Sequence, residues 1–273
     1  MELVRLPEPY DFEISTERYR AFGRDLANLW HDGGLHRVVD GAEVRIEAAA
    51  GGAAVSGLSG SEPLSRVSRY LGAAFDLDAF YAFAAGDAVL ARLAVALRGF
   101  RPPIAPDPFE SLVTSITAQQ VSLFSAFAIR NRLIERYGVA HEHAYAFPTR
   151  EAIAAASEED VVAVRFSRRK AEYVTGLARA DLDLDALAEL PDEEVTAQLV
   201  AVRGLGEWTA DWFLARHLAR PTAWPAGDLG LRKAVDAFYG PVDDLRAFGA
   251  RFHPFQNLAA HYLLTGLRVA PPE

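Results

Sequence analysis

The chain has 273 residues, of which 51% are hydrophobic, and a formal net charge of −9 at pH 7. This length and composition permit a buried core and one or two domains. The sequence contains no cysteine, which excludes disulfides, thiolate catalysis, cysteine-ligated zinc and iron–sulfur clusters. The acidic charge argues against a protein that coats DNA without regard to sequence, because binding a polyanion usually shows as a basic surplus.

The sequence carries no signal for a membrane or for export. No apolar run approaches the roughly 18 to 20 residues of a membrane span, and the start lacks the basic-then-apolar order of a signal peptide. We therefore expect a cytoplasmic protein. A local positive face is still compatible with the net charge, since four of the six residues from Arg165 to Lys170 are basic. This stretch either contacts phosphates or is the solvated start of a helix.

The first hundred residues have a mixed pattern. The expected helices span residues 15–30, 63–71 and 77–97, and the expected strands span 35–39, 43–48 and 53–58. Alternating apolar residues between glycine-containing turns predict that these strands form an antiparallel meander. Val44, Ile46 and Val55 are expected to face the core.

A proline-rich break follows from Gly99 to Pro108, and its prolines forbid a helix. Beyond it the expected helices are 109–137, 149–165, 170–180, 192–203, 207–219, 229–238, 243–251 and 254–267. Gly138 is expected as a left-handed cap that closes the first of them, and Thr149 as the cap that starts the second. The sequence therefore predicts an α+β protein, with a small antiparallel-sheet domain over residues 1–103 and an all-helical domain over residues 104–273.

Two of the predicted helices are joined only by Gly204-Leu205-Gly206. Such a turn must be sharp, and each glycine allows backbone angles closed to other residues. The first amides of the second helix then lack intrahelical partners and carry the positive end of the helix dipole, where a phosphate fits. The alternative is an ordinary helical hairpin whose glycines only permit close packing.

The motifs around this turn occur in a recognisable order. The hairpin GLGEWTADWF is followed by a Pro/Gly interval and by Asp228, with a helix behind it. Further segments of the same pattern are Asp107–Ser122, Phe147–Thr149, Arg168–Glu172, Arg251–Phe255 and, near the start, Pro9–Phe12. In this order they resemble the helix-hairpin-helix (HhH-GPD) DNA glycosylase superfamily, most closely the bacterial 3-methyladenine DNA glycosylase II (AlkA) group. The resemblance covers nearly the whole chain and is strongest from residue 107 to residue 267.

The resemblance implies that Asp228 is the catalytic residue. When the C1′–N bond breaks, the sugar gains oxocarbenium character, so a carboxylate beside C1′ stabilises the developing charge and orients or deprotonates the attacking water. Aspartate is also favoured as the N-cap of the helix that begins at Leu229, and the two roles are compatible.

Trp208 occupies the hairpin-helix position at which superfamily members that also cleave the DNA backbone carry a lysine. An indole cannot form a Schiff base, so the resemblance implies a monofunctional hydrolase that leaves an abasic site. Trp208 and Trp212 are spaced i,i+4 and share a helix face. They are either core residues or, with Phe252, the wall of a base pocket. Electron-rich rings attract a base made cationic by alkylation by about 0.5 to 2 kcal/mol. Phe252 stands where the AlkA group has a tryptophan.

The resemblance implies further contacts with DNA. Gly204, Leu205, Gly206 and Thr209 are expected at the DNA backbone. Because a duplex base must leave the stack at a cost of a few kcal/mol, a side chain must fill the gap, and Gln120 is expected in that role. Gln120 is otherwise a solvent-facing residue at a turn between helices.

No metal or other cofactor is expected, because the histidines form no metal-like set with acids at helical spacing. The resemblance leaves open a monovalent cation held by the hairpin's carbonyls. The expected partner is double-stranded DNA with alkylated bases, and we expect a monomer, since one lesion needs one active site.

Two other functions stay open. One is a hairpin-bearing DNA-binding protein without catalysis. The other is a glycosylase for another base, such as mismatched adenine, which the lack of cysteine disfavours, because those relatives usually carry a cysteine-ligated iron–sulfur cluster.

Overall fold

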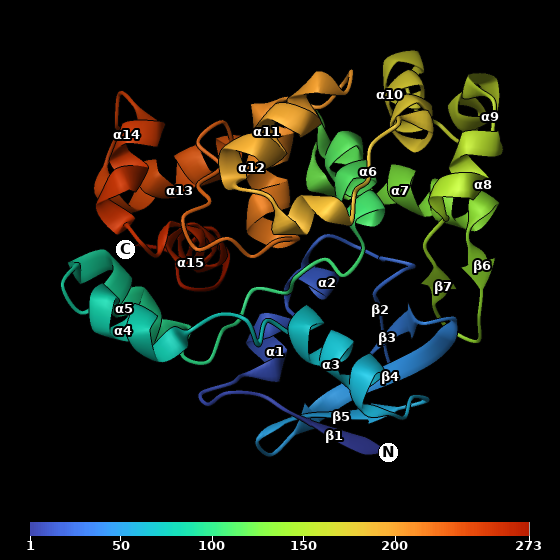
Figure 1. The fold of residues 1–273 in the computed structure, drawn as a ribbon. Helices are drawn as coiled ribbons and strands as arrows, with labels where there is room; N and C mark the ends of the chain where they lie inside the picture. Colours follow the sequence, from blue (N-terminus) through green and yellow to red (C-terminus); the bar gives the residue numbers. More distant parts are fainter. Residues whose placement is uncertain (273) are drawn as a thin grey trace.

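The computed structural model describes residues 1–272. A five-stranded antiparallel sheet lies at the N-terminal end of the chain, with the order β1-β5-β4-β3-β2 (Figure 1). Its strands are β1 (Glu2–Arg5), β2 (Leu29–His31), β3 (Gly34–Val39), β4 (Ala42–Ala49) and β5 (Gly52–Ser56). The expected meander is β3 to β5, and Val44, Ile46 and Val55 are fully buried, so this prediction is confirmed.

The two edge strands of the sheet are not apparent from the sequence. β1 pairs with β5, and β2 pairs with β3. The helix predicted over residues 15–30 is wrong: α1 (Phe12–Ser15) and α2 (Arg18–Ala21) are single turns, and Trp30 lies on β2 opposite Leu35. The apolar spacing fits a helix, but pairing with β3 decides the conformation of this segment.

One face of the sheet carries a compact core. Phe12 of α1 and Val67 and Tyr70 of α3 (Ser61–Tyr70) pack against strand residues such as Leu35 and Ile46. Figure 1 shows α1 and α3 beside the sheet. The helix predicted from residue 63 is therefore present and covers the sheet as expected.

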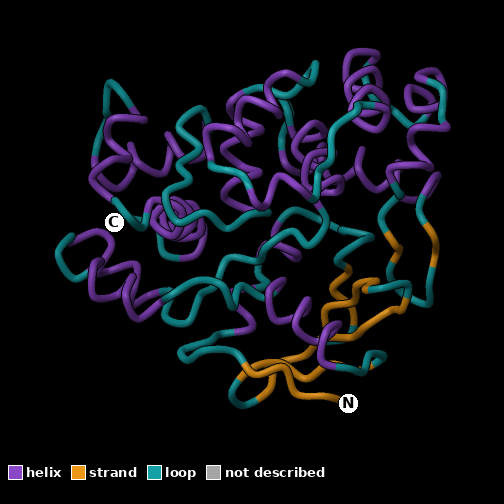
Figure 2. The backbone as a smooth tube through the Cα atoms, viewed as in Figure 1, coloured by secondary structure: helices purple, strands orange, loops and turns teal. Residues whose placement is uncertain are grey.

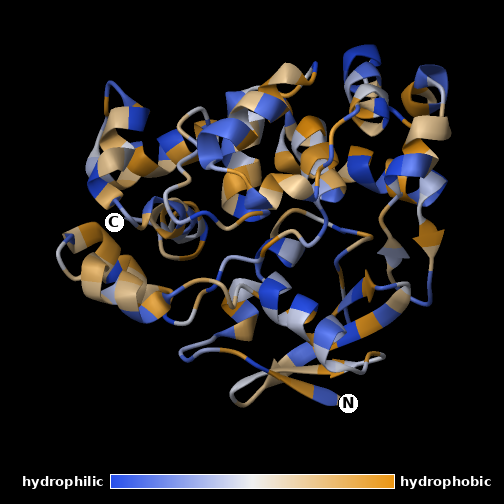
Figure 3. Cartoon of the chain, viewed as in Figure 1, coloured by the Kyte–Doolittle hydropathy of each residue, from blue (hydrophilic) through white to orange (hydrophobic). Residues whose placement is uncertain are grey.

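The chain then leaves the sheet through α4 (Leu77–Ala84) and α5 (Ala88–Ala96). The predicted helix 77–97 is interrupted because the carboxylate of Asp87 accepts hydrogen bonds from the amides of Val89 and Leu90 and so starts a new helix. Figure 3 shows both helices as strongly apolar.

These two helices share a core with the end of the chain. Phe80 and Leu93 lie in the same buried cluster as Val235 of α13 (Leu229–Tyr239) and Tyr262 of α15 (Gln256–Val269). Figure 1 shows α4 and α5 close to α15. This core joins residues on both sides of the domain boundary expected between 103 and 104, and that boundary stays a prediction.

The rest of the chain is mainly helical, as the tube in Figure 2 shows. Its further helices are α6 (Pro108–Ala118), α7 (Leu123–Tyr137), α8 (Arg150–Ala155), α9 (Glu158–Ala163), α10 (Arg168–Arg179), α11 (Asp192–Ala201), α12 (Glu207–Arg216) and α14 (Leu245–Gly249), with short 3-10 turns η1 (Ala186–Glu189) and η2 (Ala250–Phe252). A two-stranded ribbon of β6 (Val139–Ala140) and β7 (Tyr145–Ala146) corrects the expectation of an all-helical second half. Among the described residues, no helix is long and apolar enough to cross a membrane.

Two long predicted helices are each broken in two. Helix 109–137 is divided between α6 and α7 by a turn in which Gln120 has a φ of 56°. Helix 149–165 is divided between α8 and α9, because Ser157 forms a capping box that starts α9. The side chain of Thr149 caps α8, as predicted.

Gly138 is not the left-handed cap that the sequence predicts, since its φ is −81°. A Cβ at this position would lie 2.4 Å from the carbonyl oxygen of Ala146. The glycine therefore permits the close approach of β7 to the end of α7.

A buried network of charges joins the sheet to the helices. Arg37 of β3 and Arg130 of α7 each pair with Glu110 of α6, at 2.5 Å and 2.6 Å, and Arg130 also pairs with Asp25. All four side chains are buried. Each charge has an opposite partner, which a buried ion requires. The network fixes α6 and α7, and hence the hairpin next to α6, against the sheet.

Candidate active site

The turn between α11 and α12 requires a glycine at its first position. Gly204 has a φ of 94°, and a Cβ there would lie 2.1 Å from the ring of Tyr173 on α10. Only glycine satisfies both conditions. The carbonyl oxygen of Gly204 accepts a hydrogen bond of 2.9 Å from the side chain of Gln119. The hairpin is thereby tied to the end of α6.

The start of α12 presents free backbone amides. Gly206 is its N-cap residue and offers no side-chain cap. Within residues 1–272, the amides of Gly206, Glu207 and Trp208 donate to no acceptor in the chain. Gly206 is exposed, with nothing within 4 Å of a Cβ built on it. Because these amides lie at the positive end of the helix, they are suited to bind an anion such as a phosphate.

The other two hairpin residues expected at DNA are buried. Leu205 is 5% exposed and Thr209 is 1% exposed. The amide of Thr209 donates to the carbonyl oxygen of Gly206 at 2.9 Å. The side chains of Leu205 and Thr209 are therefore packed beneath the turn. Of the four residues expected at DNA, only the two glycines reach the surface.

Asp228 meets both tryptophans of α12. Its Oδ1 accepts a hydrogen bond of 2.8 Å from the amide of Leu231, so its expected role as the cap of α13 is confirmed. Its Oδ2 accepts hydrogen bonds from Nε1 of Trp208 at 2.9 Å and from Nε1 of Trp212 at 3.0 Å. Three N–H donors thus hold the carboxylate in one orientation, and Asp228 remains partly exposed.

The tryptophans present their edges to Asp228. Trp212 is 3% exposed, and the guanidinium carbon of Arg216 lies 3.6 Å from the centroid of its ring. The ring of His261 stands edge-on to it, with centroids 5.7 Å apart. A ring face covered by a guanidinium is not open to a cationic base. Trp208, which is only partly buried, is the tryptophan that reaches the surface.

Phe252 lies outside this group, in contrast to the expectation from the sequence. It is 1% exposed and packs against Trp224, Tyr239 and Phe248. A side chain enclosed by other aromatic rings cannot line an open pocket. In this structure Phe252 is a core residue and has no part in the proposed site.

The turn between α6 and α7 lies at the surface. Gln120 is exposed, and so are the apolar side chains that follow it, Val121, Leu123 and Phe124. Sequence reasoning placed these apolar residues in a continuous helix and missed their exposure. Phe124 is 61% exposed, and large apolar side chains in this position typically mark a contact surface.

The basic residues at the start of α10 differ in their surroundings. Arg165, Arg168 and Arg169 are exposed and form no ion pair within the described residues. Lys170 instead turns inward, and its Nζ donates to the carbonyl oxygen of Thr117 at 2.8 Å. This bond and the Gln119 bond to the hairpin hold the end of α6, the start of α10 and the hairpin together as one surface.

Two side chains at Trp212 were missed at the sequence level. Nε of Arg216 and Nε2 of His261 are each enclosed without a hydrogen-bond partner in the described part of the chain. Burial, together with nearby Arg216, lowers the pKa of His261 to about 3. Arg216 follows Trp212 by four residues, and this i,i+4 spacing is the signal that could have placed it on the same helix face.

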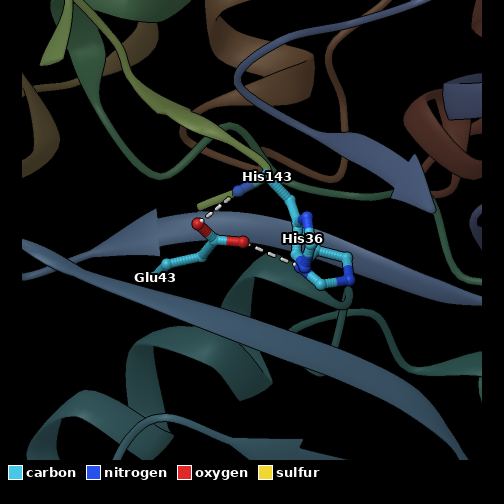
Figure 4. A group of neighbouring side chains, drawn as sticks. All are labelled: His36, Glu43 and His143. Atoms are coloured by element: carbon cyan, nitrogen blue, oxygen red, sulfur yellow. Dashed lines mark hydrogen bonds and ion pairs between the residues drawn. The ribbon is translucent and has the colours of Figure 1, made fainter. Parts of the chain in front are cut away.

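A second polar group joins the sheet to the turn between β6 and β7 (Figure 4). Glu43 of β4 accepts hydrogen bonds from Nδ1 of His36 at 2.8 Å and from the amide of His143 at 2.9 Å. Ligand atoms of these three residues lie within 4.8 Å of one another, an arrangement that their distant sequence positions conceal. However, Nη1 of Arg45 lies 3.4 Å from Nε2 of His36, and this positive charge opposes a metal ion. These hydrogen bonds connect β4 with β3 and with the turn between β6 and β7.

Three carbonyl oxygens of the hairpin, those of Val202, Gly204 and Gly206, each accept a hydrogen bond from within the chain. The monovalent cation that the resemblance left open has no part in the proposed reaction.

Comparison with known proteins agrees with this geometry. The family model for HhH-GPD superfamily base excision DNA repair proteins matches residues 113–245. A DNA-3-methyladenine glycosylase from Bacillus subtilis is 29% identical, with 71% of this chain and 70% of the relative covered. DNA-3-methyladenine glycosylase 1 from Schizosaccharomyces pombe is 30% identical, with 58% and 71% covered.

Solved structures extend the likeness to nearly the whole chain. A 3-methyladenine DNA glycosylase from Archaeoglobus fulgidus matches with a TM-score of 0.88 and 28% identity over 98% of each chain. The S. pombe 3-methyladenine DNA glycosylase in complex with abasic DNA matches with a TM-score of 0.60 and 26% identity, covering 70% of this chain and 96% of that one. The chain belongs to the HhH-GPD superfamily of base excision DNA repair proteins. Within that superfamily it is similar to the 3-methyladenine DNA glycosylases of the AlkA type.

Proposed function

We propose that the protein is a monofunctional DNA glycosylase that removes flipped-out alkylated bases of the 3-methyladenine and 7-methylguanine type and leaves an abasic site. The observation that carries this proposal is the carboxylate of Asp228. It is partly exposed and held by the N–H groups of Trp208, Trp212 and Leu231. The names of the similar proteins support the reaction.

The chemistry needs only one fixed carboxylate. As the C1′–N bond breaks, Asp228 stabilises the positive charge on the sugar and orients a water molecule for attack on C1′. The water oxygen becomes the new hydroxyl at C1′ and keeps one hydrogen, and the one proton that it releases passes to the solvent or, where the base needs one, to the departing base. A preorganised carboxylate avoids the cost of reorienting during the reaction, and this is what the indole donors provide.

DNA is the proposed partner, and the structure of the S. pombe relative with abasic DNA supports it. The free amides of Gly206 and Glu207 are suited to a backbone phosphate. Arg168 and Arg169 add exposed positive charge at the start of α10, the helix whose Tyr173 lies against Gly204. Gln120, at the exposed turn between α6 and α7, is proposed to fill the gap that the flipped base leaves.

Trp208 supports the monofunctional assignment. It is the residue of α12 whose side chain reaches Asp228 first along the helix, and its Nε1 donates to the carboxylate. An indole cannot form a Schiff base with C1′, so this position offers no nucleophile for strand cleavage. We further propose that the protein acts as a monomer, in the compartment that holds the cell's DNA.

The test is a base-release assay on methylated duplex DNA that compares the wild type with Asp228→Asn. We expect the wild type to release free base and the variant to be slower by about 100-fold or more, because a neutral amide cannot stabilise the sugar cation. Asparagine is also a good N-cap, so α13 and the affinity for DNA are expected to be retained.

Three outcomes would contradict parts of this proposal. If the wild type releases no base from any tested lesion, the protein is a DNA-binding protein without catalysis. If Asp228→Asn releases base at the wild-type rate, Asp228 is not the catalytic residue. If the DNA is nicked without added base or heat, the monofunctional assignment is wrong.

A further inference from the structure

Arg216 is a cation without a partner beside the catalytic candidate. Within residues 1–272 its guanidinium forms no hydrogen bond or ion pair, and its Nε is enclosed. Its contact is instead with the ring face of Trp212, at 3.6 Å. A largely buried charge that lacks hydrogen bonds is costly to a protein, so an acceptor from outside the chain is the natural complement.

The charged groups around Arg216 do not neutralise it. Arg18 and Arg268 add positive charge, whereas Asp228 and Tyr19 act in the opposite sense, and burial has the largest influence in lowering the pKa of Arg216. Both oxygens of Asp228 already accept hydrogen bonds. Arg268 is paired with Glu17 at 2.7 Å. The surroundings of Trp212 thus hold a surplus of positive charge.

Arg216 and Asp228 contact the same indole ring. One edge of the Trp212 ring donates to Asp228, and one face of the same ring carries Arg216. This shared contact makes the guanidinium a candidate partner for the base of a nucleotide whose C1′ is beside Asp228. Arg216 is itself partly exposed, so an acceptor can reach it.

We propose, building on the function proposed above, that Arg216 donates a hydrogen bond to an acceptor atom on the edge of the flipped base. It thereby raises the rate of release of neutral damaged bases relative to that of bases that alkylation has made cationic. A neutral base leaves with the electron pair of the C1′–N bond as an anion, which then takes up a proton as water adds to C1′. A cationic base leaves as a neutral molecule and gains nothing from a nearby positive charge. Arg216 is in this sense the residue that sets the preference between the two classes.

His261 borders the same indole ring as Arg216. Its Nδ1 is hydrogen-bonded to the carbonyl oxygen of Asn257 at 3.0 Å, so the hydrogen lies on Nδ1 and the enclosed Nε2 is an acceptor. Because Nε2 is enclosed, the base contact is assigned to Arg216 alone.

The experiment compares two duplexes that differ only in one lesion. One contains 1,N6-ethenoadenine, which is neutral, and the other contains 7-methylguanine, which is cationic. Base release is measured under single-turnover conditions for the wild type and for Arg216→Met, which keeps an unbranched apolar stem and removes the charge and the N–H donors. We expect the ratio of the ethenoadenine rate to the 7-methylguanine rate to fall by about 10- to 100-fold in the variant, as for the loss of a hydrogen bond to a charged donor.

Two further variants separate recognition from structure. Arg216→Lys keeps the charge and is expected to retain part of the wild-type ratio. Arg92→Met removes an arginine that stacks over Phe238, at 5.4 Å, away from Asp228, and is expected to leave the ratio unchanged. Melting temperatures show whether each variant is folded.

Several results would overturn the inference. An equal loss of both rates in Arg216→Met would mean that the arginine only supports the fold, and two unchanged rates would mean that it does not contact the base. A wild type that releases 7-methylguanine but no ethenoadenine would contradict the contact between Arg216 and a neutral base while leaving the proposed function intact. A wild type that releases neither base, nor any other alkylated base, would refute the proposed function itself.

Discussion

Nε1 of Trp208 donates a hydrogen bond of 2.9 Å to Oδ2 of Asp228, although the two residues are 20 positions apart in the chain. Trp212, one helical turn further along α12, donates to the same oxygen. The sequence predicts that the rings offer their faces to a cationic base, which stays a prediction. The structure adds that the N–H groups of both rings donate to the carboxylate.

This relationship predicts that the indole N–H groups matter for rate. Trp208→Phe and Trp212→Phe each keep an aromatic ring and remove one donor to Asp228. We expect each to slow base release by about 10-fold, because a hydrogen bond to a charged group contributes about 1.5 to 3 kcal/mol and part of the loss is recovered by water. Single-turnover kinetics measure the effect, with DNA affinity as the control that should stay constant. Wild-type rates in both variants would show that the donors do not position Asp228.

Alanine substitutions at the two hairpin glycines can be compared directly, because only one of the two is expected to affect stability. Gly204→Ala combines a φ of 94° with a Cβ that would lie 2.1 Å from the Tyr173 ring, so we expect a loss of stability of about 1 to 3 kcal/mol together with weaker DNA binding. Gly206→Ala meets nothing within 4 Å, and its φ is −117°, so its stability should change by less than about 0.5 kcal/mol. Any loss of DNA affinity in Gly206→Ala then reports on the phosphate contact alone. Urea unfolding and fluorescence anisotropy with duplex DNA supply the two measurements.

The buried charge network predicts a strong effect on stability. In Glu110→Gln, Arg37 and Arg130 lose the charge that both share, and we expect unfolding to require about 3 to 5 kcal/mol less. Glu172→Gln is the control, because the pair of Glu172 with Arg203 is exposed and contributes about 0 to 1 kcal/mol. Similar unfolding curves for the two variants would show that the network does not hold the sheet to α6 and α7.

Two buried histidines predict a pH dependence of stability. Burial lowers the pKa of His217 to about 4 and that of His261 to about 3, whereas an unfolded histidine titrates near 6.5. Below about pH 6.5 the unfolded chain therefore binds protons that the native state does not, and stability falls as the pH decreases. Each histidine contributes a slope of up to about 1.4 kcal/mol per pH unit between pH 6.5 and its folded-state pKa.

The measurement is denaturant unfolding at pH 7 and pH 5. His217→Gln should lose part of the difference between the two values, whatever it does to the stability at pH 7. His253→Gln, at an exposed position, should keep the full difference. A pH dependence of His217→Gln equal to that of the wild type would contradict the assignment.

The parts of the fold that the sequence predicts are those encoded by local patterns. Alternation gave strands β3 to β5, and helical spacing gave most helices from α10 onward. Where a cap or tertiary pairing overrides the local pattern, prediction fails. Ser157 starts a new helix inside an apolar-periodic stretch, and Trp30 lies on a strand because β3 provides its partner.

The residues of the candidate site also divide into those that a local motif predicts and those that depend on tertiary contacts. Asp228, Trp208 and Trp212 could be predicted because they belong to a motif of fixed spacing. Arg216 and His261 were missed because their importance depends on packing between α12 and α15, which leaves Nε of Arg216 and Nε2 of His261 without hydrogen-bond partners. Phe252 was assigned from its position alone, and the neighbouring Trp224 and Tyr239 that enclose it are far from it in the sequence.

The core that α4 and α5 share with α13 and α15 has a consequence for biosynthesis. Phe80 and Leu93 emerge from the ribosome long before Val235 and Tyr262, which complete their packing. The apolar faces of α4 and α5 therefore stay exposed until α15 has been synthesised. Contacts between residues this distant in the sequence also form slowly. A nascent chain that stalls before residue 256 would expose the apolar faces of α4 and α5, and a chaperone that recognises apolar segments would bind them.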